Sequence, residues 1–159
     1  INELSPGSSG EFNIRVYAVD NVGNISDTVA YTLISSPEVT FRINNIYFET
    51  ASSTLLSESF EVLDQIEDLL KHYPELQVEI KAHADTRGNS DYNLSLSGKR
   101  AQSVVRYLSG KGISESRLKA AGFGDSQPVN ECLKGVQCPD SKHRENRRIE
   151  FRFFIPKHQ

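Results

Sequence analysis

Polar and apolar side chains alternate along two runs near the start of the chain, as they do in β-strands with one buried face. The apolar positions are Phe12, Ile14, Val16 and Ala18 in the first run and Val29, Tyr31 and Leu33 in the second. Residues 20–24, between the runs, are rich in residues that favour turns. The pattern predicts a β-hairpin, and because an isolated hairpin is marginally stable in water, we expect it to belong to a larger sheet.

From residue 41 onward the pattern changes to strands that alternate with helices. Apolar side chains at three- and four-residue spacing predict a helix from about Ser57 to His72, which Pro74 would end. A second helix is predicted to begin at Ser97 as its N-cap and to end near Gly110. The four expected strands run through Phe41, Ile43, Ile46 and Phe48, with a kink at 44–45; through Leu76, Val78, Ile80 and Ala82; through 117–122; and through Ile149, Phe151, Phe153 and Ile155. The order βαβαββ predicts an α+β fold, in which a mixed sheet packs against helices, in addition to the N-terminal β-hairpin.

The chain of 159 residues is long enough for one main hydrophobic core with a smaller segment beside it. The residues around Pro37 have the composition of a linker. Charge changes at the same place, because residues 1–40 carry five acidic side chains and one basic side chain, whereas the remainder is nearly balanced. We therefore predict a β-strand segment over 1–36, a linker over 37–40 and a second domain over 41–159.

The composition excludes two broad classes of protein. No apolar run approaches the roughly 18 residues that a membrane-spanning helix needs, so we expect no membrane insertion by this part of the protein. The net charge of -3 is opposite to the basic surface expected of a general nucleic-acid binder. The chain contains no methionine, so we expect it to be part of a longer protein whose signal peptide or lipid anchor would lie upstream.

Two cysteines, Cys132 and Cys138, lie in a polar segment rich in turn formers. In an oxidising compartment they would close a small disulfide loop, and in a reducing one they would form a free pair or half of a metal site. His143 is a further ligand for the metal alternative, but the cysteine spacing exceeds that of zinc knuckles and a fourth ligand is not evident. The cysteines by themselves leave both alternatives open.

A catalytic interpretation rests on His83 and Asp85, which would share one face of a strand, as in a hydrolase pair. The sequence has no nucleophile elbow, no glycine-rich phosphate loop and no His-Glu-x-x-His zinc motif. We therefore expect neither an enzyme nor a cofactor.

Several short motifs occur in a fixed order along residues 40–155. They are Phe48 with Leu55, HADTRG at 83–88, NLSLSGKRA at 93–101, GI at 112–113, GFG at 122–124 and NRRIE at 146–150. Together they resemble the OmpA-like C-terminal domain, which also occurs in peptidoglycan-associated lipoproteins and flagellar stator proteins. The resemblance implies non-catalytic binding of peptidoglycan through the meso-diaminopimelate residue of its stem peptide. It also implies a location on the periplasmic side of the outer membrane of a Gram-negative bacterium, where the domain anchors an envelope protein to the cell wall. Separately from the resemblance, a homodimer is a candidate partner.

Two further resemblances and some departures refine this interpretation. Residues 16–24 (VYAVDNVGN) resemble the last two strands of bacterial immunoglobulin-like repeats, so 1–36 is interpreted as the end of such a domain. The insert from Cys132 to Cys138 resembles a variant common in Bacteroidetes members of the family, which favours a disulfide. Thr50 and Ala51 replace the family's usual aromatic and acidic residues, and Ala84 replaces the usual Thr or Ser.

Asp85 and Arg100 match the family's acidic and basic ligand contacts. Asp85 would follow the second strand, and Arg100 would be the third residue of the second helix, where free backbone N–H groups favour an anion. Diaminopimelate ends in an ammonium and a carboxylate on one carbon, which suit one carboxylate and one guanidinium of the protein. The alternative is a structural pair, in which Asp85 caps its own turn and Arg100 bridges to it.

Neighbouring residues complete the predicted site. Asn93 and Ser95 would hydrogen-bond peptide amides, although both are also ordinary turn residues. Leu94 would pack on the methylene chain of the ligand or seal the loop, and solvation is the favoured interpretation for Thr86 and Arg87. One of the two arginines before the last strand would reach the cleft. The predicted ligand-binding residues are Asp85, Arg100, Asn93, Leu94, Ser95, Thr86 and Arg148.

Overall fold

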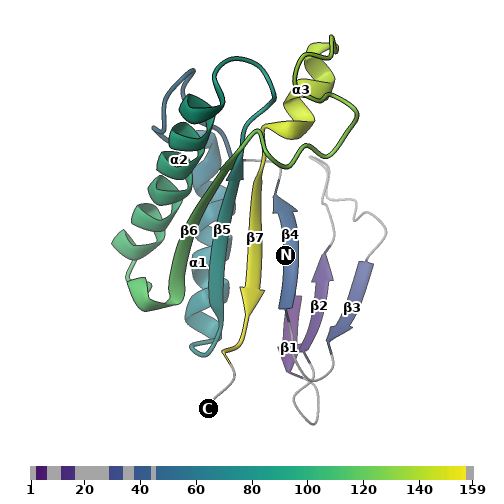
Figure 1. Ribbon diagram of the computed structural model, residues 1–159. Coiled ribbons are helices and arrows are strands. Elements are labelled where there is room, and N and C mark those ends of the chain that lie inside the picture. The colour runs from purple at the N-terminus through teal and green to yellow at the C-terminus, as the bar shows by residue number, and fades with distance from the viewer. Residues whose placement is uncertain (1–2, 7–11, 17–28, 34–37, 44–45, 157–159) are drawn as a thin grey trace.

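The computed structural model describes residues 3–6, 12–16, 29–33, 38–43 and 46–156, which form two separate β-sheets and their helices (Figure 1). The first sheet consists of β1 (Glu3–Pro6), β2 (Phe12–Val16) and β3 (Val29–Leu33), in that order. β2 and β3 are antiparallel, so the two strands of the predicted hairpin do pair. The predicted turn at 20–24 lies outside the described residues. Sequence analysis misses β1, because four residues are too few to show alternation.

The second sheet carries the candidate site and has the strand order β4-β7-β5-β6. Its strands are β4 (Glu38–Ile43), β5 (Gln77–His83), β6 (Leu118–Gly124) and β7 (Ile149–Phe154). β5 and β6 run parallel, whereas β7 is antiparallel to both β4 and β5. This mixed sheet, packed against helices, confirms the predicted α+β fold.

β4 begins earlier and ends sooner than the first strand expected for this domain. Residues 38–40, which sequence analysis assigns to a linker, pair with β7, with Glu38 opposite Phe154. Ile46 is buried in the core and Phe48 forms an isolated bridge with Leu55, so both lie beyond the strand. The expected kink at 44–45 falls outside the described residues.

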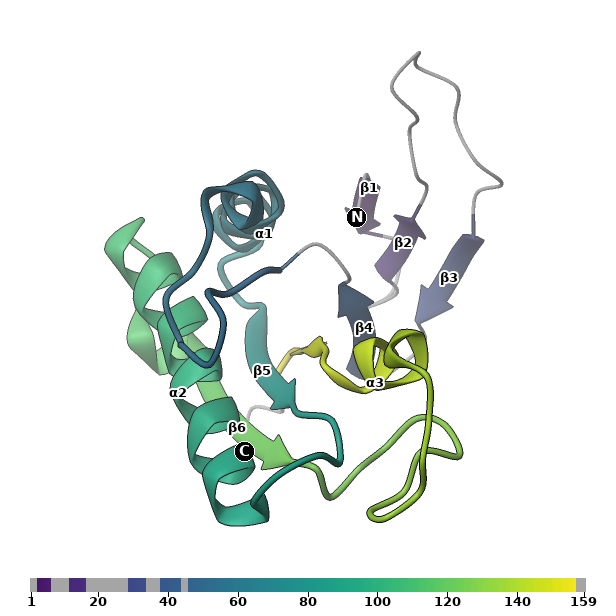
Figure 2. The same ribbon diagram turned by 90° about the horizontal axis from the view of Figure 1, so that it is seen from above.

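Two long helices cover one face of this sheet (Figure 2). α1 (Phe60–His72) follows the 3-10 turn η1 (Ser57–Ser59), and together they confirm the first predicted helix. α2 (Ser90–Gly110) connects the parallel strands β5 and β6 and packs on both strands and on α1. The core between helices and sheet includes Leu63, Ile66, Leu70, Val78, Ile80, Val104, Leu108, Phe151 and Phe153.

α2 begins at Ser90, well before the N-cap that sequence analysis predicts. Its N-cap is Asn89, whose side chain accepts a hydrogen bond from the backbone N–H of Tyr92 at 2.9 Å. The first turns are largely polar, so the apolar stripe that reveals the helix starts only further along it. Arg100 therefore lies in the middle of α2, where backbone N–H groups bond within the helix. The predicted anion site on free N–H groups beside Arg100 is wrong.

Ser97, the predicted N-cap, instead joins α2 to β6. Its hydroxyl donates to the carbonyl of Leu94 and accepts from the N–H of Gly124, each at 2.9 Å. Gly122 approaches Gly98 so closely that a Cβ on Gly122 would lie 2.3 Å from the Gly98 nitrogen. These glycines bring the helix onto the backbone of the sheet, which fixes the position of the residues that α2 contributes to the site.

Two short helical segments complete the described chain. η2 (Glu115–Arg117) leads into β6, and α3 (Asp140–Asn146) lies at the end of the sheet where β5 ends and β7 begins (Figure 1). Sequence analysis does not predict α3, because its seven residues carry no apolar stripe. In the part of the chain that the structure describes, no helix is both long and apolar enough to cross a membrane.

Candidate functional site

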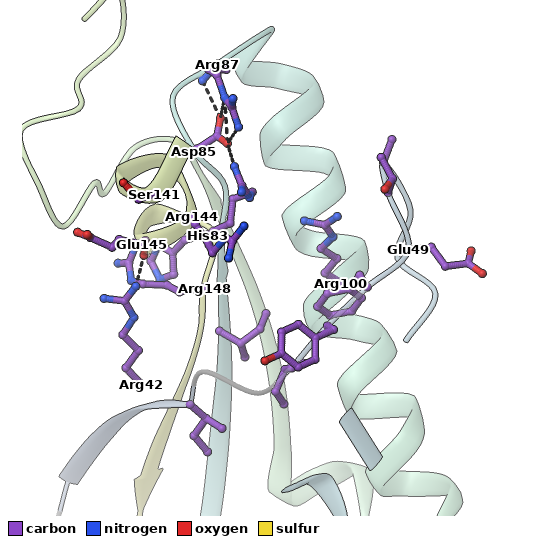
Figure 3. A pocket seen from close by; sticks show the side chains of 18 residues that line it. Arg42, Glu49, His83, Asp85, Arg87, Arg100, Ser141, Arg144, Glu145 and Arg148 are labelled. Atoms are coloured by element: carbon purple, nitrogen blue, oxygen red, sulfur yellow. Dashed lines mark hydrogen bonds and ion pairs between the residues drawn. The ribbon is translucent and has the colours of Figure 1, made fainter. Parts of the chain in front are cut away.

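A cavity of about 830 Å³ opens at the end of the second sheet, beside the last residues of β4 and β5 and the first residue of β7. α3 contributes side chains from one side (Figure 3). The segment 46–51 and Arg100 of α2 contribute from the other. Asp85 and Arg100, the two central residues of the predicted site, both line this cavity.

Asp85 follows β5 and accepts hydrogen bonds from two arginines. Its Oδ1 accepts from the backbone N–H of Arg87 at 3.0 Å, and its Oδ2 accepts from Arg87 Nη2 at 2.8 Å and from Arg147 Nη1 at 2.5 Å. Burial by itself would raise the pKa of Asp85, but the hydrogen bonds from Arg87 and Arg147 outweigh burial and lower the pKa to about 2. The carboxylate is therefore ionised at neutral pH and already surrounded by cationic donors.

The structural pair that sequence analysis leaves open as an alternative is present only in part. Asp85 does cap its own turn, through the N–H of Arg87. Arg100 does not bridge to Asp85, because its Nε donates to the carbonyl of Ser52 at 2.9 Å and its guanidinium carbon lies 5.0 Å from the centre of the Phe48 ring. The acid and the base thus line one cavity from different elements without neutralising each other.

Arg100 leaves part of its guanidinium available to a ligand. Its Nε bond holds a tight turn in which Glu49 N–H donates to the carbonyl of Thr54 at 3.0 Å and Ala51 adopts a left-handed φ of 53°. Within the described residues, the two terminal nitrogens of Arg100 make no hydrogen bond to the protein. Burial lowers the pKa of Arg100 from its ordinary value, but the guanidinium stays a permanent cation.

Cationic side chains outnumber acidic ones around the cavity. The charged lining residues are Arg42, Arg87, Arg100, Arg144, Arg147, Arg148, Glu49, Asp85 and Glu145. Arg87 and Arg147 are engaged by Asp85, and Arg148 Nε donates to Glu150 at 2.6 Å. The remaining charge is positive, so the cavity favours a ligand that carries carboxylates.

His83 lies at the end of β5 with its side chain fully buried and its ring stacked on Phe123. Its Nε2 is 3.5 Å from a carboxylate oxygen of Glu150, and neither ring nitrogen makes a hydrogen bond within the described residues. Burial lowers the pKa of His83 to about 4; the charge of Arg148 acts in the same direction and that of Glu150 opposes it. Asp85 bonds to arginines rather than to His83, so the catalytic pair considered from the sequence does not form.

Four predicted ligand-binding residues lie outside the lining of the cavity. Asn93 is buried and donates through Nδ2 to the carbonyls of Asp85 and Arg87, at 3.2 and 2.9 Å, so it shapes the loop that carries Asp85. Thr86 is also buried, and its hydroxyl donates to the carbonyl of Cys132. Leu94 and Ser95 are exposed on α2. These residues support or flank the cavity, and adjacency in the sequence does not show which side chains of a loop or helix turn towards the ligand.

The two consecutive arginines before β7 have different environments. Arg148 lines the cavity as predicted, but its side chain is only 5% exposed and is held by Glu150. Arg147 is the one that reaches Asp85. Sequence analysis misses Arg42 and Arg144 in the lining, because only the folded sheet brings β4 and α3 to the same cavity.

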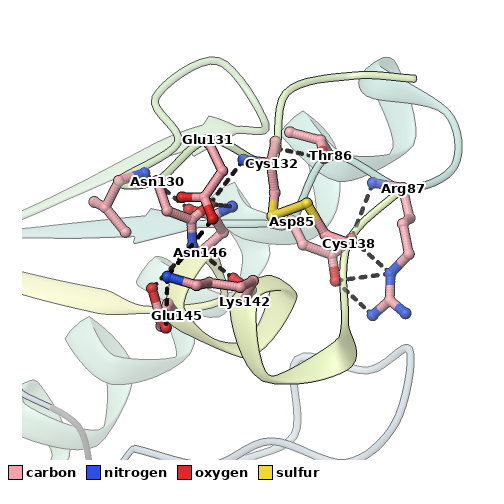
Figure 4. The surroundings of a disulfide bond; sticks show 11 residues. Asp85, Thr86, Arg87, Asn130, Glu131, Cys132, Cys138, Lys142, Glu145 and Asn146 are labelled. Atoms are coloured by element: carbon pink, nitrogen blue, oxygen red, sulfur yellow. Dashed lines mark hydrogen bonds and ion pairs between the residues drawn. A yellow bond between two sulfur atoms is a disulfide. The ribbon is translucent and has the colours of Figure 1, made fainter. Parts of the chain in front are cut away.

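A disulfide joins Cys132 and Cys138 in the segment before α3 (Figure 4). It confirms the predicted bridge and overturns the metal alternative, because both sulfurs are bonded to each other and cannot ligate a metal as thiolates. Within the part of the chain that the structure describes, no group of three or more potential ligands gathers around His143 or elsewhere. The disulfide lies next to the loop that carries Asp85, and the hydrogen bond from the Thr86 hydroxyl to the carbonyl of Cys132 connects the two segments.

The chain belongs to the OmpA family, whose sequence model matches residues 47–139. The match includes Asp85, Arg100 and the disulfide loop, and it ends just before α3.

Relatives and solved structures agree with this assignment. The chain is 32% identical over 95 residues to the peptidoglycan-associated lipoprotein of Agrobacterium fabrum, an alignment that covers 58% of this chain and 54% of the relative. Among solved structures, it superposes on the peptidoglycan-associated lipoprotein of Burkholderia pseudomallei with a TM-score of 0.60, 30% identity and coverage of 68% and 87%. It also superposes on the cell wall anchor of the T6SS from Pseudomonas aeruginosa with a TM-score of 0.61, 26% identity and 88% coverage of each chain. None of these three is named as an enzyme, in agreement with the sequence analysis. The chain spans about half the length of the curated relatives it matches.

Proposed function

We propose that this chain binds peptidoglycan without catalysis, through the meso-diaminopimelate residue of the stem peptide, and so anchors an envelope protein to the cell wall from the periplasmic side of the outer membrane. The observation that carries the proposal is the placement of Asp85 and Arg100 in the lining of one cavity, with opposite charges that do not pair with each other. The names of the lipoprotein relatives and of the cell wall anchor support the same class of ligand.

The ligand's head group fits the two residues by charge. The terminal carbon of diaminopimelate carries a carboxylate, which would accept two parallel hydrogen bonds from the terminal nitrogens of Arg100. The ammonium on the same carbon would approach Asp85. Because Arg100 Nε is occupied by Ser52, the guanidinium is held in one orientation before the ligand arrives.

Binding at Asp85 requires an exchange of donors, because Arg87 and Arg147 already surround its carboxylate. Arg87 is the partner better placed to leave. Its side chain is 53% exposed, and Asp140 offers it a second carboxylate oxygen at 3.2 Å. The ligand ammonium would take the position of the Arg87 guanidinium, while Arg147 stays in contact with Asp85.

Calorimetric titration with matched stem peptides tests the proposal. A peptide with meso-diaminopimelate should bind, and the equivalent with lysine should bind at least about tenfold more weakly, because lysine lacks the terminal carboxylate that Arg100 would hold. Asp85→Asn and Arg100→Gln should each remove the preference. Equal affinity for both peptides, or a preference that survives both substitutions, would contradict the head-group assignment.

We also propose the larger arrangement predicted from the sequence, with residues 1–36 as the end of an immunoglobulin-like domain and 41–159 as the wall-binding domain. The three-stranded sheet of β1, β2 and β3 supports a separate N-terminal unit. The pairing of residues 38–40 with β7 supports an earlier start for the wall-binding domain, at or before Glu38, in place of the predicted linker. The Bacteroidetes origin of the insert and the homodimer stay predictions.

A further inference from the structure

The α3 side of the cavity is not used by the proposed head-group contacts. Arg42 near the end of β4 and Arg144 in α3 line this side together with Ser141 and Glu145. Figure 3 shows these four residues across the cavity from Arg100. The volume of about 830 Å³ lies within the roughly 300–1,000 Å³ of pockets that hold ligands larger than one amino-acid head group.

Arg42 faces the cavity without an acidic partner among the described residues. Its Nη2 donates to the main-chain carbonyl of Glu145, which carries no net charge. The Glu145 carboxylate is directed elsewhere, because it accepts from Asn130 Nδ2 at 2.9 Å and lies 3.9 Å from Lys142 Nζ. Glu150, the residue opposite Arg42 on β7, is engaged by Arg148.

The positive charge of Arg144 is also only weakly balanced by acidic side chains. Its one ion pair in the described structure joins its Nη2 to Asp140 Oδ2 at 4.0 Å, and its side chain is 79% exposed. Asp140 also lies 3.2 Å from Arg87 and 3.7 Å from Arg147, so its single charge is shared among three arginines. Two guanidinium groups from different elements therefore present unneutralised positive charge to the same side of the cavity.

We propose that Arg42 and Arg144 form a second carboxylate subsite, which binds a free carboxylate of the stem peptide other than the one on the diaminopimelate head group. The inference rests on the proposed function, because it places the head group at Asp85 and Arg100. A stem peptide carries such carboxylates on its glutamate residue and at its C-terminal end. The subsite makes the domain selective for stem peptides in which the second carboxylate is free, against those in which it is amidated.

The test is a calorimetric cycle of three proteins and three peptides. The proteins are the wild type, the double variant Arg42→Gln with Arg144→Gln, and the control Arg106→Gln. Arg106 is an arginine of α2 outside the cavity lining, and its Nη2 donates to Ser103. The peptides are the diaminopimelate stem peptide, its glutamate α-amide and its C-terminal amide. Both cavity arginines lie at the surface, and unchanged circular dichroism of the double variant is required before titration.

The wild type should lose about tenfold in affinity for one of the two amides, and that amide identifies the bound carboxylate. The double variant should bind the parent peptide about tenfold more weakly than the wild type and show no further loss with that amide. The Arg106→Gln control should behave as the wild type. Equal affinity of the wild type for all three peptides, or a loss in the double variant that is the same for the parent and both amides, would overturn the subsite.

These titrations, together with the titration of the lysine peptide described above, separate this inference from the proposed function. If the wild type distinguishes the amides but binds lysine and diaminopimelate peptides equally, the head-group assignment fails and the subsite stands. If it prefers diaminopimelate but ignores both amides, the subsite fails and the proposed function stands.

Discussion

At the scale of single residues, the nitrogens of Arg100 have separate tasks. Nε holds the turn at residues 49–54 by donating to the carbonyl of Ser52, and the guanidinium lies over the ring of Phe48 in a cation–π contact. In the proposed binding mode, the two terminal nitrogens hold the ligand carboxylate. Such a division of tasks is possible for arginine and not for lysine, which has one nitrogen at the end of a flexible chain.

We therefore predict that Arg100→Lys weakens binding of the diaminopimelate peptide by on the order of tenfold, although charge is kept. A lysine ammonium has three N–H donors, but all of them are on one nitrogen, so it cannot hold the carbonyl of Ser52 and form two parallel bonds to the ligand carboxylate. Titration calorimetry measures the loss, with Arg106→Lys on the outer part of α2 as the matched control. Wild-type affinity in Arg100→Lys would mean that the site needs only a positive charge.

In the proposed binding mode, Arg87 competes with the ligand ammonium for Asp85, so removing Arg87 should improve binding. We predict that Arg87→Gln binds the diaminopimelate peptide about two- to fivefold more tightly, since an exposed ion pair of this kind contributes less than about 1 kcal/mol. The gain should appear as a faster association rate in stopped-flow fluorescence with a labelled peptide. Weaker binding would show instead that Arg87 contacts the ligand directly.

At the scale of structural elements, the disulfide loop and the loop after β5 depend on each other. Cys132 is buried, its carbonyl accepts from Thr86, and its N–H donates to Asn130 at 3.1 Å. Asn130 in turn accepts from Asn146 at the end of α3. The segment around the disulfide thus contacts both Thr86, the residue next to Asp85, and α3, the helix that carries Arg144.

Replacing both cysteines by serine should lower the free energy of unfolding by about 2 kcal/mol, the chain-entropy contribution of so short a loop. Binding of the diaminopimelate peptide should weaken a fewfold, because the support of Asp85 loosens, without being abolished. Chemical denaturation and titration measure the two effects, and wild-type protein treated with a reductant should reproduce both. Unchanged affinity in the reduced protein would show that the insert does not support the site.

At the scale of the whole molecule, the buried histidine makes stability depend on pH. The pKa of His83 is about 4 in the folded protein and close to 6.5 in an unfolded chain. Above pH 6.5 both states hold the neutral ring. As the pH falls from 6.5 towards 4, His83 is protonated in the unfolded state but stays neutral in the folded state. The free energy of unfolding therefore decreases over this pH range. The charged groups that act on the ring are Arg148, Glu150 and Lys81.

We predict that wild-type protein loses up to about 3 kcal/mol of unfolding free energy between pH 7 and pH 4 through His83 alone. His83→Gln should show a shallower dependence over this range in urea denaturation, whatever its stability at pH 7. Asp85 contributes in a separate, lower window, because its stabilising ionised form is lost only as the pH falls towards about 2. Equal slopes for wild type and variant between pH 7 and pH 4 would contradict the role of His83.

Periodicity located the main elements because burial on one face leaves a local record in the sequence. The stripe of Leu63, Ile66 and Leu70 predicted α1, and the alternation of Phe151 and Phe153 predicted β7. The same logic missed the polar start of α2 and all of α3, because their outward-facing turns bury too few apolar side chains to leave a pattern.

The sequence by itself determined the α+β fold of the OmpA-like domain, the family through its ordered motifs, and Asp85 and Arg100 as residues that would share a site. Each of these depends on residue type and order along the chain. Only the tertiary structure decided that Asp85 is held by Arg87 and Arg147 rather than by Arg100. It also decided that Asn93 and Thr86 support the loop of Asp85 from outside the cavity lining. The presence of Arg42 and Arg144 in the lining likewise depends on the fold. Those contacts join residues up to 62 positions apart, and their directions are set by how β4, α2 and α3 pack around the end of one sheet.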